Sequence, residues 1–277
     1  MGTTAPSAPD YAAITRRQQT VWSGGDYSAV AARITLISER LADSADLRSG
    51  SRVLDVAGGS GNTALAAARC GADVVSLDYV PSLLERGRER ARAEGLEVEY
   101  VEGDAQALPF TDASFDAVIS AVGVMFAPDQ ATVAAEMLRV CRPGGTIAIA
   151  NWTPDGFIGG LLRTVGAHVP PPAGVASPLL WGTEDHVRTL FGAGVEDVRT
   201  RRRHQVFRFD SPEAFTGFFR EMYGPTRTAF GTLTDEGGRA LAGEIGDLVR
   251  RFDRLGGDGP VAIPAEYLEV VATRTAH

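Results

Sequence analysis

Short apolar strands alternate with amphipathic helices over residues 48–150, and this alternation limits what the chain can fold into. The expected strands are Arg52–Ala57, Asp73–Asp78, Val98–Glu102, Phe115–Ser120 and Thr146–Ala150. Helices are expected between them at Asn62–Cys70, Ser82–Glu94 and Ala131–Val140. Strands that alternate with helices form parallel sheets, because each right-handed crossover places its helix on a face of the sheet. The pattern therefore predicts a doubly wound, Rossmann-like α/β fold.

The rest of the chain completes the expected architecture. Two more strands, Val195–Phe209 and Tyr267–Thr273, give a mostly parallel, seven-stranded sheet. Ser211-Pro212-Glu213 is a good helix start, and the helical pattern that follows is too long for a simple loop. The predicted organisation is an N-terminal helical lid (1–47), an α/β domain (48–210 and 257–277), and a helical cap insertion on the substrate side (211–256). Within the lid, Tyr27–Leu41 has apolar residues at helical spacing, which predicts a helix over this segment.

Composition excludes several classes of function. The net charge is −8 and the pI about 5.1, so long-range repulsion from phosphates argues against a nucleic-acid partner. No apolar run approaches the ~18 residues that a membrane span needs, and the polar amino terminus does not have the order of a signal peptide. We therefore expect a cytoplasmic protein. The four histidines are scattered, which predicts no metal site. The sequence leaves a homodimer open.

A glycine-rich turn follows the first expected strand and points to a nucleoside site. The turn runs from Asp55 to Gly61, and its glycines allow close approach of the backbone to a ligand. The helix behind it offers free N–H groups and the positive end of its dipole. Asp78 closes the second strand 17 residues after Gly61, where an acid can accept hydrogen bonds from ribose hydroxyls.

This turn also satisfies a dinucleotide-binding fingerprint over Gly59–Ala64, so an NAD-dependent oxidoreductase is one alternative. Three features argue against it. Asp55 would repel a pyrophosphate, whereas it suits a ligand with an ammonium group. Gly103-Asp104-Ala105 places another acid at the carboxyl edge of the sheet, and Arg142-Pro-Gly-Gly145 leads into the fifth strand.

Four separated motifs resemble those of a known family. They are Val53–Gly61, Gly103–Phe110, Ser114–Asp116 and Leu138–Gly145. In order and spacing they are similar to the class I S-adenosylmethionine (SAM)-dependent methyltransferases, with the closest likeness to the small-molecule group that includes the ubiquinone and menaquinone biosynthesis methyltransferases. The likeness is strong over residues 50–150 and general elsewhere. It implies SAM as the cofactor.

The resemblance also implies roles for individual residues. Ala57, Gly59, Ser60 and Gly61 should lie under the methionine part of SAM, with Asp55 close to its ammonium group. Ala57 stands where the family often has glycine. Asp78 should hold the ribose beside Tyr79, Asp104 and Ala105 should contact the adenine edge, and Ser120 should lie near the sulfonium.

Aromatic side chains gather where the acceptor should bind. The residues predicted to line this pocket are Trp22, Phe126, Trp152, Phe219 and Tyr223. A large apolar pocket favours a small hydrophobic or aromatic metabolite. His168, expected in a loop after the fifth strand, is the candidate general base, and an ordinary exposed loop histidine is the alternative.

The sequence thus predicts methyl transfer from SAM to a small, hydrophobic or aromatic molecule, with the acceptor atom (O, N or C) open. A methyltransferase-like protein that binds SAM or a nucleoside without methylating, as a regulator or a cyclase, is the other alternative, since no catalytic residue stands out.

Overall fold

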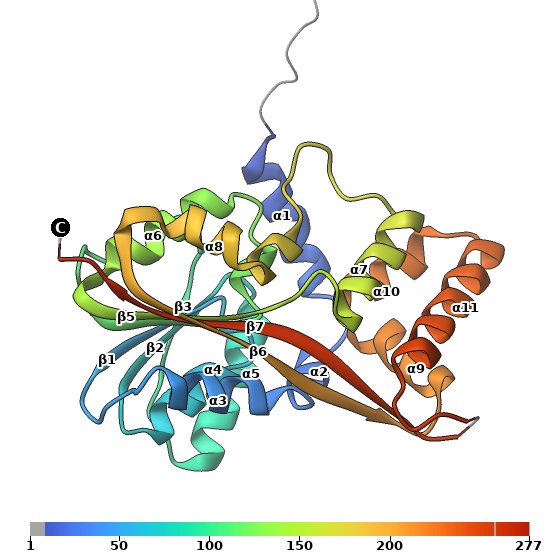
Figure 1. Cartoon of the computed structure of the whole chain (residues 1–277), viewed down its shortest axis with the longest axis horizontal. Coiled ribbons are helices and arrows are strands. Elements are labelled where there is room, and N and C mark those ends of the chain that lie inside the picture. The colour runs from blue at the N-terminus through green and yellow to red at the C-terminus, as the bar shows by residue number, and fades with distance from the viewer. Residues whose placement is uncertain (1–8, 258, 277) are drawn as a thin grey trace, which may run out of the picture.

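A single seven-stranded sheet forms the centre of the computed structural model, which describes residues 9–257 and 259–276 (Figure 1). Within these residues the strands have the order β3-β2-β1-β4-β5-β7-β6. Their bounds are β1 Arg52–Val56, β2 Asp73–Asp78, β3 Glu99–Glu102, β4 Phe115–Ala121, β5 Cys141–Trp152, β6 Val195–Phe209 and β7 Val261–Arg274.

The sheet is mixed, and this refines the prediction of a mostly parallel one. Strands β1 to β5 pair in parallel, whereas β7 runs antiparallel to both of its neighbours, β5 and β6. β7 starts at Val261 rather than at the predicted Tyr267. Pro264 has no N–H to donate, so from the sequence alone it argues against a strand that begins before Tyr267. It is tolerated because it lies beyond the last residue that pairs with β5, where β6 is the only partner strand.

Helices cover both faces of the sheet and one end of it (Figure 1). One face carries α3 (Thr35–Ser44), α4 (Asn62–Arg69) and α5 (Pro81–Glu94), and the other carries α6 (Gln130–Val140) and α8 (Glu184–Phe191). A separate group gathers at the far ends of β6 and β7. It contains α7 (Phe157–His168), α9 (Pro212–Met222), α10 (Gly224–Thr232) and α11 (Asp235–Phe252). The chain begins with α1 (Tyr11–Trp22) and α2 (Tyr27–Ala31).

Helix α7 was not predicted. Its Gly159-Gly160 pair is unfavourable inside a helix. The structure shows why both glycines are there: a Cβ on Gly159 would lie 2.2 Å from the carbonyl oxygen of Pro154, and one on Gly160 would lie 2.9 Å from Leu248 of α11. The close packing of α7 against these two groups therefore outweighs the low helix propensity of its glycines.

Two predicted helical segments are divided in the structure. The segment expected over Tyr27–Leu41 breaks between α2 and α3, where Asn62 donates to the carbonyl of Ala31 at 2.8 Å and Gln205 donates to that of Arg33 at 2.6 Å. Side chains from elsewhere thus take up carbonyls that a continuous helix would use. The cap segment 211–256 forms three helices, α9 to α11, and its start at Pro212, capped by Ser211, is as predicted.

The cap helices share the core of the sheet. Phe157, Phe207, Phe215 and Phe219 are each at most 2% exposed. Their rings contact one another across α7, β6 and α9, with centroids 4.3 Å apart for Phe215 and Phe219 and 5.8 Å apart for Phe207 and Phe219. Because these rings fill one core, the cap is anchored on the sheet.

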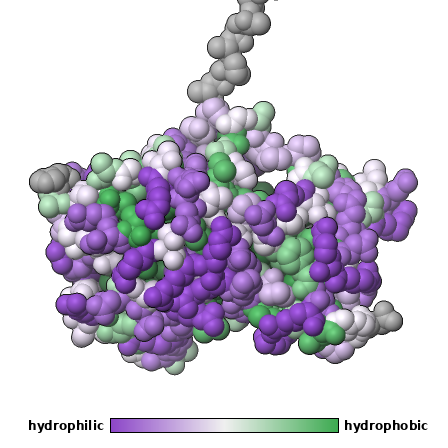
Figure 2. All heavy atoms as spheres, viewed as in Figure 1, coloured by the Kyte–Doolittle hydropathy of each residue, from purple (hydrophilic) through white to green (hydrophobic). Residues whose placement is uncertain are grey.

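The surface in the view of Figure 2 is predominantly hydrophilic, with hydrophobic residues in small patches. Among the described residues, no helix combines the length and apolar character needed to cross a membrane.

Candidate functional site

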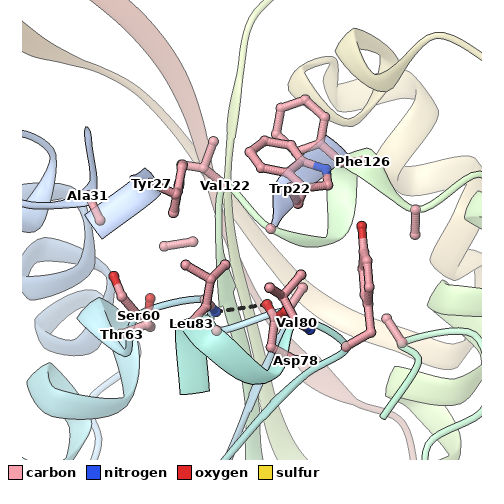
Figure 3. A pocket seen from close by; sticks show the side chains of 18 of the residues that line it. Trp22, Tyr27, Ala31, Ser60, Thr63, Asp78, Val80, Leu83, Val122 and Phe126 are labelled. Atoms are coloured by element: carbon pink, nitrogen blue, oxygen red, sulfur yellow. Dashed lines mark hydrogen bonds between the residues drawn. The ribbon is translucent and has the colours of Figure 1, made fainter. Parts of the chain in front are cut away.

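A cleft that is partly open to solvent lies at the carboxyl ends of the parallel strands (Figure 3). Turns after β1, β2, β3 and β4 form its floor, and α1 to α3 cover it. The lining residues from these turns include Ala57, Gly58, Gly59, Ser60, Asp78, Tyr79, Val80, Asp104, Ala105, Gln106, Val122, Gly123 and Phe126. Those from the helices include Thr15, Gln18, Trp22, Tyr27, Ala31, Ile34 and Ser38.

The turn after β1 exposes backbone to the cleft. Gly59 and Gly61 have positive φ angles of 56° and 86°, and Gly61 is the N-cap of α4. A Cβ on Gly58 would lie 2.3 Å from the Ser76 hydroxyl and 2.6 Å from an Asp55 carboxylate oxygen. Only glycine fits there, because the turn packs directly against these two side chains.

Two non-glycine residues in the cleft also have left-handed backbone. Ala57 has φ 53° and Val122, which is β-branched, has φ 62°. Such angles cost free energy and are often held at functional sites. Contact between the turns after β1 and β4 holds them, since a Cβ on Gly123 would lie 2.2 Å from the carbonyl oxygen of Ala57.

Asp78 lines the cleft at the end of β2. Its carboxylate accepts hydrogen bonds from the backbone N–H groups of Gly59 and Val80, both at 2.9 Å. Burial raises the pKa of Asp78 to about 6, although these hydrogen bonds act in the opposite direction. The carboxylate thus fixes the turn after β1 and presents an acid to the cleft.

Asp55 lies beneath the turn and is fully buried. One carboxylate oxygen accepts from the Ala64 N–H at 2.9 Å, and the other has no hydrogen-bond partner among the described residues. Burial raises the pKa of Asp55 to about 8, and the nearby charge of Asp78 adds to this shift.

Helix α1 is tied to both sides of the cleft. Gln19 donates to the carbonyl of Tyr79, and Gln106 donates to the Thr15 hydroxyl at 2.9 Å. Gln106 also accepts from the Asp129 N–H at 3.1 Å. These bonds place α1 over the cleft, where the sequence predicted a lid. Residues 1–8 of the predicted lid lie outside the described residues.

A second, smaller cavity adjoins the cleft. The two share Tyr27, Ile34, Val122 and Phe126. Its remaining lining residues are Val30, Trp152, Ile158, Leu161, Phe207, Phe219 and Tyr223. We call this cavity the aromatic pocket.

Aromatic rings form the junction between the cleft and the aromatic pocket. The Trp22 centroid lies 4.9 Å from that of Phe126, 5.4 Å from that of Tyr223 and 5.5 Å from that of Tyr27. In Figure 3, Trp22 and Phe126 lie across the cavity from Asp78. The cleft, with Asp78 among its lining residues, and the aromatic pocket therefore adjoin each other at shared side chains.

The structure brings most of the predicted site residues together. Of the predicted cofactor residues, Ala57, Gly59, Ser60, Asp78, Tyr79, Asp104 and Ala105 line the cleft. Of the predicted pocket residues, Trp22 and Phe126 line the cleft, and Phe126, Trp152, Phe219 and Tyr223 line the aromatic pocket.

Three predicted cofactor residues, Asp55, Gly61 and Ser120, are not among those that line the cleft. These residues lie beside or beneath the residues that line the cleft. The buried Ser120 hydroxyl donates to the carbonyl of Val56 at 2.7 Å and accepts from the Val124 N–H at 3.2 Å, so it joins the ends of β1 and β4.

His168 lines neither cavity. It is the last residue of α7 instead of a loop residue, and its Nε2 lies 3.1 Å from a carboxylate oxygen of Glu244 on α11. The structure therefore does not bring this candidate base to the site.

Several lining residues were missed from the sequence. Gln106 stands inside a motif that resembled the family, so a signal for it was present. The apolar face of α2 and α3, with Ala31 and Ile34, reads as ordinary core from its spacing. Val122 carries no sequence signal, because its role depends on a backbone angle.

Comparison with known proteins adds three findings. The family described as "Methyltransferase domain" matches residues 54–149. An uncharacterised protein of Mycobacterium tuberculosis is 44% identical over 245 residues, covering 87% of this chain and 89% of its own. A demethylmenaquinone methyltransferase of Thermus thermophilus is 37% identical over 142 residues, covering 46% of this chain and 64% of its own.

Solved structures agree on the fold. A crystal structure of a protein titled a putative methyltransferase, from Bacillus halodurans, aligns with a TM-score of 0.61 at 22% identity. The alignment covers 86% of this chain and 98% of that one. At this level of identity the likeness is one of fold.

Proposed function

The chain belongs to the class I SAM-dependent methyltransferases, and from that premise we propose that it methylates a small hydrophobic or aromatic metabolite. The observation that carries the proposal is the adjacency of the two cavities, which share four lining residues. The cleft at the strand ends, with its acidic residues, adjoins a pocket lined by apolar and aromatic side chains. A methyl donor in the first would face an acceptor in the second.

The residues of the cleft fit SAM. Asp78 would hold the ribose hydroxyls, and the exposed backbone of Gly58 and Gly59 would lie along the methionine part. Asp104 and Gln106 would lie at the adenine end, under α1. When bound, SAM supplies an activated methyl group together with its leaving group. The protein then has to position the acceptor and exclude water.

The aromatic pocket supports the proposed class of acceptor. The described residues that line it include no Asp, Glu, His, Arg or Cys, so a charged substituent would find no counter-ion among them. Pockets lined by apolar and aromatic side chains bind apolar ligands, and their few polar groups set the orientation.

Calorimetric titration with SAM, S-adenosylhomocysteine and NADH tests the cofactor. We expect binding of the first two and none of the third. An acceptor screen with SAM labelled in its methyl group, using aromatic and isoprenoid metabolites beside charged ones, then tests the substrate class. Transfer only to the charged set would contradict the proposal.

A pair of variants on α7 locates the acceptor. Leu161 lines the aromatic pocket, whereas Leu162 lines neither cavity. With an acceptor from the screen, Leu161→Phe should raise KM severalfold because the added ring fills the pocket, and the Kd for SAM should not change. Leu162→Phe is the matched control. Equal effects of the two variants would place the acceptor elsewhere.

A further inference from the structure

Two phenolic side chains are the main polar groups among the residues that line the aromatic pocket. They belong to Tyr27 and Tyr223, and the indole nitrogen of Trp152 is the other side-chain heteroatom among its lining residues. No hydrogen bond to either hydroxyl is found within the described part of the chain, and neither oxygen is among the fully buried side-chain atoms that lack a partner, so both keep some exposed surface. Hydroxyls in this state are available to a ligand.

The same pocket has no group that can take up a proton near neutral pH. Burial raises the pKa of Tyr27, and the charge of Asp78 raises it further. Burial also raises the pKa of Tyr223, and Tyr27 adds to the shift. Both side chains therefore stay protonated and act as hydrogen-bond donors.

Such a pocket suits three classes of methyl acceptor to different degrees. An aliphatic alcohol is a weak nucleophile unless a base removes its proton. A protonated amine would be buried without a counter-ion. An acidic phenol or enol can lose its proton to solvent before it binds, and its oxygen then matches two hydroxyl donors.

Building on the proposed function, we propose that the acceptor binds as a phenolate or enolate whose oxygen accepts hydrogen bonds from Tyr27 and Tyr223. The acceptor's electron pair, on that oxygen or on the carbon conjugated with it, forms the bond to the methyl carbon. The carbon–sulfur bond breaks and its electrons stay on sulfur. The anionic and sulfonium charges thereby cancel, which an apolar pocket favours.

The positions of the two tyrosines suit this role. Tyr27 lines both cavities and so stands where donor and acceptor would meet. Its ring centroid is 6.4 Å from that of Tyr223. Asp78, at the end of β2, is the carboxylate whose charge acts on Tyr27, and no charged residue lines the aromatic pocket. Tyr27 and Tyr223 are thus positioning residues rather than bases.

The probe is 4-nitrophenol, whose phenolate is yellow and whose phenol is colourless. It is titrated into the full chain loaded with sinefungin, a SAM analogue that carries an ammonium group and transfers no methyl group. Absorbance across a pH series then gives the pKa of the bound probe without turnover. Burial in an apolar pocket without donors would raise that pKa, whereas the two hydroxyls should lower it below the value of the free probe.

Tyr223→Phe and Tyr27→Phe remove one hydroxyl each and keep the ring. Each should weaken binding of the phenolate about tenfold or more, as expected for one hydrogen bond to a charged group. Binding of uncharged 4-nitroanisole should not change. Tyr267→Phe is the matched control, because Tyr267 is a buried tyrosine on β7 that lines neither cavity.

Each outcome is decisive. A bound probe with a raised pKa, no binding of the probe, or equal phenolate affinity in all three variants would overturn the proposal while leaving methyl transfer intact. If sinefungin does not bind, the proposed function and this inference both fail. In a series of acceptors that the protein methylates, the pH at which the methylation rate levels off should follow the pKa of each acceptor. A common value for all acceptors would indicate a protein base.

Discussion

The cleft and the aromatic pocket are built in different ways. Backbone features shape the floor of the cleft: the glycines after β1, the left-handed residues Ala57 and Val122, and N–H groups that bind Asp78. Side chains line the pocket, and they come from α2, the start of α3, the turn after β4, β5, α7, β6, and α9 with the residue that follows it. The first kind of site is encoded in a few short motifs, whereas the second depends on the arrangement of distant segments.

This difference predicts which substitutions each region is sensitive to. A backbone site tolerates little change at a few positions, because an added Cβ meets another main chain. A pocket of packed rings tolerates substitution by side chains of similar shape. Because its rings also form the core, other changes there affect stability. The cleft should therefore respond to mutation mainly in ligand affinity, and the pocket mainly in stability.

The largest expected effect is in the pocket. Phe219→Ala should lower the free energy of unfolding by about 3–5 kcal/mol, because it removes a ring that is 2% exposed and leaves a cavity. Denaturant unfolding measures it, and Phe219→Leu should cost clearly less. The affinity for SAM should change little in Phe219→Leu. A decrease in the free energy of unfolding below about 1 kcal/mol for the alanine variant would mean that neighbouring side chains fill the space left by the ring.

The next effect is in the cleft. Asp78→Ala should weaken SAM binding by about 1.5–3 kcal/mol, roughly 10- to 150-fold, since charge-assisted hydrogen bonds are removed. Asp73→Ala, at the exposed start of the same strand, is the control. Calorimetry with both variants decides, and unchanged affinity in Asp78→Ala would refute the placement of the ribose.

A pair of glycines tests how tightly the backbone of the cleft is packed, with an exposed helical glycine as the reference. Gly123→Ala should destabilise the protein by about 1–3 kcal/mol, because the new methyl group would lie 2.2 Å from the Ala57 carbonyl oxygen. Gly243→Ala, on the open surface of α11, should stabilise it by about 0.5–1 kcal/mol through helix propensity. Thermal unfolding of both shows whether backbone contact in the cleft is as tight as described.

The last prediction concerns the pH dependence of stability. Because the pKa of Asp55 is raised from 3.8 to about 8, its protonated form is favoured in the folded state. The stability it contributes is complete below pH 3.8 and is lost as the pH rises through about 8. Asp55→Asn should therefore weaken the decline in stability over this range. Unfolding at several pH values measures it, and parallel curves for the two proteins would argue against the shift.

The sequence was most informative where signals are local. The strand Val195–Phe209 was predicted with the bounds it has in β6, and the cleft motifs were placed at the ends of their strands. It was least informative for α7, whose paired glycines fit only against Leu248 and Pro154, and for the break between α2 and α3. His168 was expected in a loop on the substrate side for the same reason, since the helix that carries it was missed.

By itself, the sequence determined the α/β alternation, the glycine-rich turn and the acids at the strand ends. These features depend on residues within a few positions of one another, where periodicity and backbone freedom act directly. The tertiary structure alone decided the antiparallel placement of β7, the position of α7, and the meeting of Tyr27 with Tyr223 across almost two hundred residues of chain. Such contacts form because distant apolar faces are buried together, and no local pattern specifies which faces will meet.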